Sequence, residues 1–178
     1  MEHVIAIDGV SGVGKTTFLE YVSRKGYAVI RPADFYKKRK DGDTVEAWRC
    51  VWSATMYRIT HTGADLVFLD RSPASFEVYQ QASLDWLYTF LPYFKGRIKF
   101  HGVLFESTID RIRENKGLKK RETPMDYFGL TTHQASLKFR KAKVWGNGWD
   151  SVCYPYGYRT NKLRLLEKIF KDCDVKEK

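Results

Sequence analysis

A glycine-rich segment near the start of the sequence constrains this chain more than any other feature. Gly9-Val10-Ser11-Gly12-Val13-Gly14-Lys15-Thr16 matches the pattern G-x-x-x-x-G-K-[ST] and follows a short apolar run, Val4 to Ile7. Glycines allow the backbone to turn successive N–H groups inward, and the start of a helix adds partial positive charge. We therefore expect this loop to bind the phosphates of a nucleoside triphosphate, with Lys15 on the β- and γ-phosphates and the Thr16 hydroxyl on magnesium. The residues predicted to bind ATP are Gly9, Ser11, Gly12, Val13, Gly14, Lys15, Thr16 and Thr17.

Apolar runs and helical patterns alternate along the sequence. Short runs that end at a polar or glycine-rich turn are typical of buried strands, and longer segments repeat apolar residues at helical spacing. The predicted strands are Val4–Ile7, Tyr27–Ile30, Leu66–Leu69, Val103–Phe105 and 150–154. The predicted helices are Thr16–Arg24, Thr44–His61, 76–82, 84–91, 107–115, 123–144 and a last helix capped by Thr160, with Leu163, Leu166, Ile169, Phe170 and Cys173 on its buried face. This alternation predicts an α/β fold with a parallel sheet, whose ligands bind at the carboxyl ends of the strands.

Composition indicates one globular domain spanning residues 1–178. The chain is long enough to bury a core and too short for two large domains. No apolar run approaches the roughly 18 residues of a membrane-spanning helix, and we see no secretory signal. The three cysteines are widely spaced, which argues against a disulfide framework or a zinc cluster and favours a cytoplasmic location.

Positive charge is concentrated in the second half of the chain. The net charge is +10, and residues 95–178 hold 20 basic and 10 acidic side chains. Such a field attracts polyanions, whether nucleotide phosphates or nucleic acid. Lysines and arginines cluster in two places along the whole chain, Lys37–Lys40 and the run from Arg111 to Arg121. We expect a basic lid at about 111–123 that closes over bound nucleotide, excludes water and stabilises a phosphoryl group in transfer.

A second group of polar residues follows the third predicted strand. Asp70 and Arg71 fall at its carboxyl end. A carboxylate there can hold magnesium or its waters, together with Thr16, and an arginine can clamp a phosphoryl group with two parallel hydrogen bonds. The competing interpretation is a surface ion pair.

The segment from Asp70 to Gln80 resembles the D-R-Y-x-x-S-x-x-A-Y-Q element of thymidylate kinases, with Asp70, Arg71, Ser75, Tyr79 and Gln80 in register. Residues 111–122 resemble the R-I-x-x-R-G…D-R-x-E lid of that family, and residues 122–128 resemble the segment after the lid in deoxynucleoside kinases, a sister family that shares the fold. The resemblance implies a three-layer P-loop kinase fold with a five-stranded parallel sheet flanked by helices.

The same resemblance implies an activity and roles for residues. Magnesium-ATP would be the donor and a deoxynucleoside monophosphate, most specifically dTMP, the acceptor. Arg71 would hold the acceptor phosphate, and Arg113 or Arg121 of the lid would stabilise the transferred phosphoryl group. The catalytic residues are then Lys15, Asp70, Arg71, Arg113 and Arg121. The family also implies a homodimer through helices that flank the sheet.

The acceptor side departs from both families. Thymidylate kinases have R-E-P after the second strand and deoxynucleoside kinases have E-P, whereas this chain has Ile30-Arg31-Pro32, with Asp34 two residues later. The base-reading helix does not align cleanly, so Trp48 and Trp52 either stack on a base or pack in the core. The residues predicted to bind the acceptor are Arg31, Asp34, Arg49, Arg58, Arg71, Ser75, Tyr79 and Gln80.

Three alternatives stay open from the sequence. A deoxynucleoside kinase would phosphorylate a 5′-hydroxyl and needs a carboxylate base, for which Asp34 is the candidate. A polynucleotide 5′-kinase would suit the net charge of +10. A non-catalytic nucleotide- or nucleic-acid-binding module would retain the loop without turnover. The expected partners are small-molecule nucleotides, with nucleic acid less favoured and no membrane.

Overall fold

The central strand of the sheet is the apolar run that precedes the glycine-rich loop. In this computed structural model the strand is β1, Glu2–Asp8, and its residues Val4–Ile7 are completely buried. A strand buried on both faces needs an uninterrupted apolar sequence, which this segment provides. The structure describes residues 2–9, 12–36, 44–73, 75, 87, 91–94, 96–106, 153–155 and 161–176.

All five strands run parallel, in the order β2-β3-β1-β4-β5. The other strands are β2 (Ala28–Ile30), β3 (Leu66–Asp70), β4 (Ile98–Glu106) and β5 (Cys153–Pro155). In register, Ile7 of β1 pairs with Asp70 of β3, and Asp8 pairs with Leu104 of β4. The glycine-rich loop and the Asp70–Arg71 turn therefore leave neighbouring strands at the same edge of the sheet.

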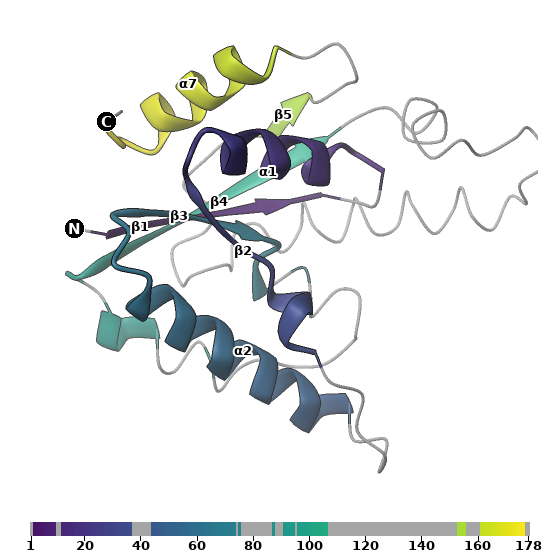
Figure 1. Ribbon diagram of the computed structural model, residues 1–178, viewed down its shortest axis with the longest axis vertical. Helices are drawn as coiled ribbons and strands as arrows, with labels where there is room; N and C mark the ends of the chain where they lie inside the picture. The colour runs from purple at the N-terminus through teal and green to yellow at the C-terminus, as the bar shows by residue number, and fades with distance from the viewer. Residues whose placement is uncertain are drawn as a thin grey trace, which may run out of the picture.

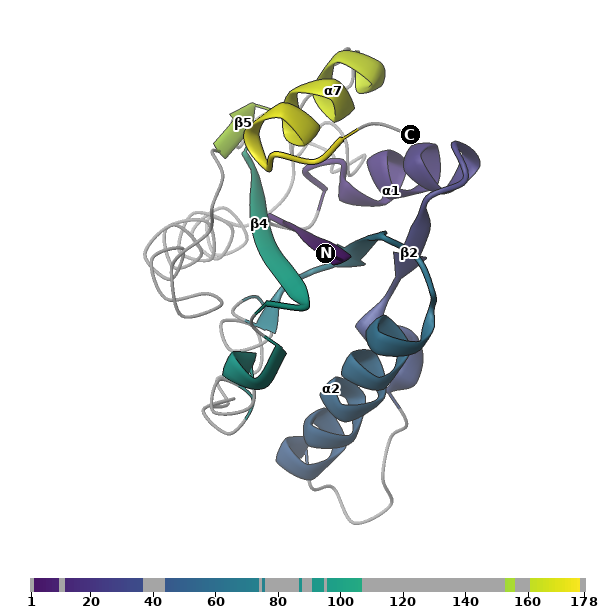
Figure 2. The same cartoon turned by 90° about the vertical axis from the view of Figure 1, so that its left-hand side faces the viewer.

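Helices cover both faces of the sheet. Helices α1 (Lys15–Arg24) and α7 (Lys162–Asp172) lie together on one face, and α2 (Thr44–His61) lies on the other (Figures 1 and 2). Two short 3-10 helices, η1 (Pro32–Phe35) and η2 (Leu91–Phe94), follow β2 and precede β4. The described part of the chain thus has three layers, helix on sheet on helix.

The core under α1 is built from aromatic side chains that meet edge to face. The Phe18 ring lies 5.3 Å from that of Phe105 and 6.3 Å from that of Phe68, centroid to centroid. Tyr27 adds edge-to-face contacts with Phe68 and with Phe170 of α7. Rings packed in this way bury large apolar areas, so they hold α1, and with it the loop before it, firmly against the sheet.

Helix α2 places its two tryptophans in the core. Trp52 is completely buried, Trp48 is 7% exposed, and the Trp48 ring packs against Tyr36 at 4.8 Å. These positions favour the core-packing interpretation of both residues over base stacking. None of the helices in the described part of the chain is long and apolar enough to cross a membrane.

Several predicted boundaries need correction. Strand β4 begins at Ile98, five residues before the prediction, and Pro32–Phe35 forms a 3-10 turn in place of a loop. Helix α7 is capped by Asn161, whose side chain accepts a hydrogen bond from the Arg164 N–H, and not by Thr160. Leu163 is 43% exposed, and Leu165 takes its place on the buried face of α7. The helices predicted at 107–115 and 123–144 lie outside the described residues, as do most residues of those predicted at 76–82 and 84–91.

Candidate active site

The glycine-rich loop is shaped by glycines in the left-handed region. Gly9, Gly12 and Gly14 have φ values of +143°, +84° and +103°. A Cβ atom on Gly9 would lie 2.6 Å from the carbonyl oxygen of Phe105 and 2.8 Å from a methyl carbon of Val13, so no other residue fits there without displacing backbone. Val13 is completely buried and anchors the loop in the core. Ser11 lies outside the described residues.

Lys15 is the first residue of α1 and turns its side chain back over the loop. It is only 6% exposed, and its ammonium group donates a hydrogen bond to the Gly9 carbonyl oxygen at 2.7 Å. Thr16 and Thr17, in the same first turn, are exposed. Gly14 occupies the N-cap position and has no side chain to cap that turn, whose N–H groups therefore suit an anion.

The turn after β3 brings Arg71 to this loop. The Arg71 backbone N–H donates to the Ile7 carbonyl oxygen at 3.1 Å, and its φ of +80° is unusual for a residue with a side chain. The guanidinium donates to the Ser75 hydroxyl oxygen at 3.0 Å and, at the long distance of 3.5 Å, to the Gly9 carbonyl oxygen. Ser75, predicted to bind the acceptor, therefore orients Arg71 in this structure.

Two cations thus converge on one carbonyl oxygen. Lys15 belongs to the predicted donor site and Arg71 to the predicted acceptor site, and both donate to Gly9. Like charges held this close repel each other, and an anion bound between them would remove the repulsion. The arrangement is suited to phosphate oxygens at the carboxyl edge of the sheet.

The sequence did not single out Asp8 as a functional residue. Asp8 ends β1, is completely buried, and accepts the Ser72 backbone N–H with its two carboxylate oxygens at 3.0 and 3.1 Å. Burial raises the pKa of the Asp8 carboxyl group, while hydrogen bonding from Ser72 and the charge of Arg71 act in the opposite direction. The sequence signal that could have found Asp8 is an acidic residue directly between a buried strand and the glycine-rich loop.

The remaining predicted acceptor residues are spread over two elements. Arg31 is half-buried just before η1, Asp34 is exposed within η1, and Arg49 and Arg58 are exposed on α2. Arg49 forms an ion pair with Glu46 of its own helix at 3.6 Å. No hydrogen bond within the described ranges joins any of these four side chains to Lys15 or Arg71. Tyr79, Gln80, Arg113 and Arg121 lie outside those ranges.

Oxygen atoms suited to magnesium occur at the same edge. Thr16 offers an exposed hydroxyl and Asp70 a half-buried carboxylate. Magnesium prefers hard oxygen ligands and is commonly held by one or two protein groups together with substrate phosphates, so this pair fits the predicted ion. Where the structure describes side chains, no three His, Cys, Asp or Glu residues gather as a metal cluster.

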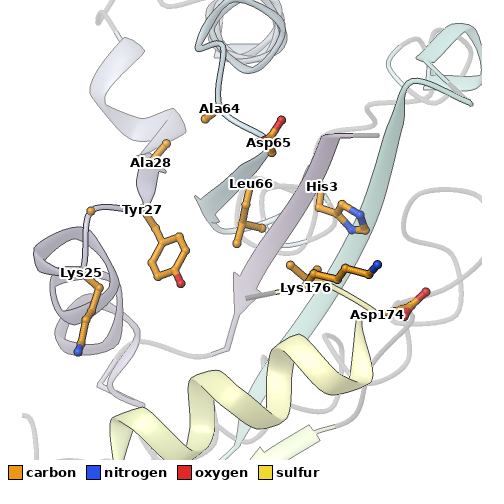
Figure 3. Close-up of a pocket in the computed structure, with 11 residues that line it drawn as sticks. His3, Lys25, Tyr27, Ala28, Ala64, Asp65, Leu66, Asp174 and Lys176 are labelled. Carbon is orange, nitrogen blue, oxygen red and sulfur yellow. The ribbon is translucent and has the colours of Figure 1, made fainter. Parts of the chain in front are cut away.

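A cavity of about 620 Å³ lies at the opposite edge of the sheet, by the amino ends of β1, β2 and β3. Figure 3 shows the side chains of Tyr27, Leu66, His3 and Lys176 among those that line it. None of the residues predicted for the site lines this cavity. It is separate from the edge where Lys15 and Arg71 meet.

No protein-family model matches the sequence, and no curated protein matches it. Solved structures do match along nearly the whole chain. A tunicamycin resistance protein from Deinococcus radiodurans has a TM-score of 0.63 and 13% identity, covering 99% of this chain and 98% of its own. A gluconokinase from Sinorhizobium meliloti has a TM-score of 0.58 and 14% identity, covering 97% and 91%. A deoxyadenosine kinase from M. mycoides has a TM-score of 0.50 and 13% identity, covering 96% and 98%. At such identities the likeness shows the fold: an α/β fold with a parallel sheet flanked by helices, as in P-loop small-molecule kinases.

Proposed function

We propose that this chain transfers the γ-phosphoryl group of ATP to a small-molecule acceptor, and that the acceptor is a deoxynucleoside monophosphate, most specifically dTMP. The observation that carries the proposal is the convergence of Lys15 and Arg71 on the Gly9 carbonyl oxygen. One cation belongs to a loop of the triphosphate-binding pattern and the other to a turn that resembles the acceptor element of thymidylate kinases. The kinase-like fold supports the same class of reaction.

On the donor side, the loop would hold the triphosphate and Lys15 would leave Gly9 for the β- and γ-phosphates. The exchange costs little, because a neutral carbonyl partner is replaced by an anionic one, and charge-assisted hydrogen bonds are the stronger kind. Magnesium held by Thr16 and Asp70 would neutralise charge on the phosphate oxygens. Burial of Lys15 keeps water away from its charge and strengthens that contact.

On the acceptor side, Arg71 would grip the phosphate of the monophosphate. A phosphate acceptor is already ionised near neutral pH, so the reaction needs positioning and charge stabilisation more than a general base. Ser75 fixes one side of the Arg71 guanidinium, which limits the rotamers the arginine must lose on binding. Arg113 or Arg121 would complete the positive surroundings of the transferred group.

A panel of acceptors tests this proposal. Purified protein is incubated with magnesium-ATP and each common nucleoside or nucleoside monophosphate, and the products are separated and identified. We expect diphosphate formation with dTMP above all others, and we expect Lys15→Ala to abolish most of it. Hydrolysis of ATP with no phosphorylated product from any acceptor would contradict the proposal.

A second candidate is a deoxynucleoside kinase, in which a 5′-hydroxyl accepts the phosphoryl group. The likeness to the deoxyadenosine kinase favours it, and so does the exposed carboxylate of Asp34 beyond β2, because a hydroxyl needs a base to remove its proton. Thymidine and dTMP, compared side by side, separate the two functions. If thymidine is phosphorylated by the wild-type protein and not by Asp34→Asn, the nucleoside kinase is established. If dTMP is phosphorylated by both proteins, Asp34 is excluded as a base for phosphorylation of dTMP.

A further inference from the structure

The end of β1 holds a completely buried carboxylate, that of Asp8. Both of its oxygens accept the Ser72 backbone N–H. Hydrogen bonding from Ser72 and Ser75 and the charge of Arg71 favour its ionised form. Burying a carboxylate costs several kcal/mol of desolvation, and these contacts offset it only in part, because the pKa of Asp8 is still raised by burial. Such a residue directly after the buried apolar run Val4–Ile7 points to a role in positioning.

The group that Asp8 holds is a strained turn. Arg71 adopts a φ of +80°, which costs an L-residue on the order of 1 kcal/mol and persists only where neighbouring bonds impose it. Those bonds are the Arg71 N–H to the Ile7 carbonyl, the Ser72 N–H to Asp8, and the Ser75 N–H to the Ser72 carbonyl. Two of the three come from the last two residues of β1.

The same end of β1 begins the phosphate loop. Gly9 follows Asp8 directly, and its carbonyl oxygen accepts from both Lys15 and Arg71. A Cβ on Gly9 would collide with the Phe105 carbonyl, so the peptide that links Asp8 to the loop has little freedom to shift. The phosphate loop and the Arg71 turn are therefore linked through the adjacent residues Asp8 and Gly9. The Asp8 carboxylate binds the turn, and the Gly9 carbonyl accepts from Lys15 and Arg71.

We propose that Asp8 is a positioning residue that holds the Arg71 turn against the start of the phosphate loop, so that a triphosphate ordering the loop also orders Arg71 for a second anion. This inference rests on the proposed function, since it assigns the second anion to the acceptor. Asp8 touches neither reacting group; it acts through Arg71. Coupling of this kind needs no long pathway, because the donor and acceptor elements share adjacent residues.

A double-mutant cycle tests this role in the full-length protein with magnesium-ATP and dTMP. Asp8→Asn keeps the shape of the side chain and one acceptor oxygen, but it removes the negative charge beside Arg71 and replaces the other oxygen that accepts the Ser72 N–H with an NH2 group, which cannot accept a hydrogen bond. We expect Asp8→Asn to lower kcat/KM for dTMP by about tenfold while KM for ATP changes less than about threefold. When Arg71→Ala is already present, adding Asp8→Asn should lower kcat/KM by a further factor of less than about two. Asp65→Asn, an exposed residue just before β3, is the matched control and should behave as wild type.

Two kinetic outcomes would overturn the inference. The first is an unchanged kcat/KM for dTMP in Asp8→Asn. The second is a double variant whose loss of kcat/KM equals the product of the losses in Asp8→Asn and Arg71→Ala. A measurement on the wild-type protein covers the case in which Asp8→Asn fails to fold. Exchange of the Ser72 amide hydrogen should slow about tenfold or more when a non-hydrolysable ATP analogue binds with magnesium. Unchanged Ser72 exchange alongside slowed exchange in the phosphate loop would overturn the coupling. Slowed Ser72 exchange in a protein that phosphorylates nothing would leave the coupling standing and defeat the proposed function.

Discussion

Lys15 and Arg71 owe their arrangement to backbone geometry at single residues. The left-handed glycines turn the loop so that the Gly9 carbonyl faces the Lys15 ammonium, and the positive φ of Arg71 turns its guanidinium toward the same oxygen. Two unit charges a few ångströms apart in partly buried surroundings repel by about 1–4 kcal/mol. That repulsion is relieved when an anion binds, so the pair favours phosphate oxygens.

Removing the lysine tests the donor half of this pair. Lys15→Ala should reduce kcat/KM by at least about tenfold and weaken ATP binding, because the β- and γ-phosphates lose their charged partner. Lys171→Ala, an exposed lysine of α7, serves as the control and should keep wild-type kinetics. Circular dichroism checks that both variants are folded, and equal kinetics for the two folded variants would contradict the role of Lys15.

Gly9 and Gly26 form a matched pair for testing the loop geometry. Both have positive φ, +143° and +89°, but a Cβ on Gly26 meets nothing within 4 Å whereas one on Gly9 collides with the Phe105 carbonyl and with Val13. Gly26→Ala should cost about 1 kcal/mol of unfolding free energy from backbone strain alone. Gly9→Ala should cost more, and it should also abolish the rise in Tm that we expect magnesium-ATP to give to the wild-type protein. The comparison uses chemical denaturation and thermal melts, and an ATP-induced Tm shift that persists in Gly9→Ala would contradict the crowding argument.

Among the helices and strands, the sequence predicts correctly those whose bounds depend on local residues. Helix α2 begins at Thr44 and ends at His61, as its apolar spacing predicts. The prediction for β4 is too short because Lys99 and His101 interrupt the apolar pattern of the sequence. In the structure both residues belong to the strand and pair with β1. Pairing with β1 stabilises this part of β4, and the local sequence of β4 alone does not reveal that pairing.

The same contrast holds within the site. The placement of the glycine-rich loop, Lys15 and Arg71 at the carboxyl edge of the sheet could be predicted because their sequence pattern is local. The burial of Asp8 depends on Ser72, 64 residues further along the chain, and the exposure of Leu163 depends on how α7 meets the sheet. The strained φ of Arg71 is likewise imposed by β1 and is not encoded at Arg71 itself.

The start of α7 offers a test of element stability. Asn161 caps the helix through the Arg164 N–H at 3.1 Å, and Asn161→Ala should lower the unfolding free energy by about 1 kcal/mol. Asn161→Asp keeps the acceptor oxygen and should stay within about 0.5 kcal/mol of wild type. Urea denaturation of the three proteins measures both values, and equal losses for the two variants would contradict the capping role.

At the scale of the whole molecule, a histidine pair joins β1 to β4 at the edge away from the loop. The Nδ1 atom of His3 and the Nε2 atom of His101 lie 3.1 Å apart, a hydrogen bond that exists only if one of the two nitrogens lacks a proton. Burial lowers the pKa of His101 to about 4, with His3 and Lys99 adding to the effect and Asp174 opposing it. Burial, followed by Lys99 and the chain's amino terminus, also lowers the pKa of His3, again with Asp174 opposing.

These shifts predict acid sensitivity. In the unfolded chain both imidazoles take up protons near pH 6.5, whereas folded His101 resists protonation until about pH 4. Stability from the pair is therefore complete above pH 6.5 and is lost as pH falls to about 4, by roughly 2 kcal/mol. Urea midpoints across this range should fall with acid in the wild type and in His61→Gln, which alters an exposed histidine of α2. A variant with His101→Asn should show a shallower decline, and an equally steep one would contradict the assignment.

The central claim is that Arg71 presents a second cation, beside Lys15, to the phosphate of an acceptor. The most direct measurement is kcat/KM for dTMP with saturating magnesium-ATP in wild type, in Arg71→Ala and in Arg97→Ala, whose arginine is exposed and pairs with Glu2 at 3.8 Å. We expect a loss of at least about tenfold in Arg71→Ala and wild-type behaviour in Arg97→Ala. Normal kinetics in a folded Arg71→Ala protein would contradict it.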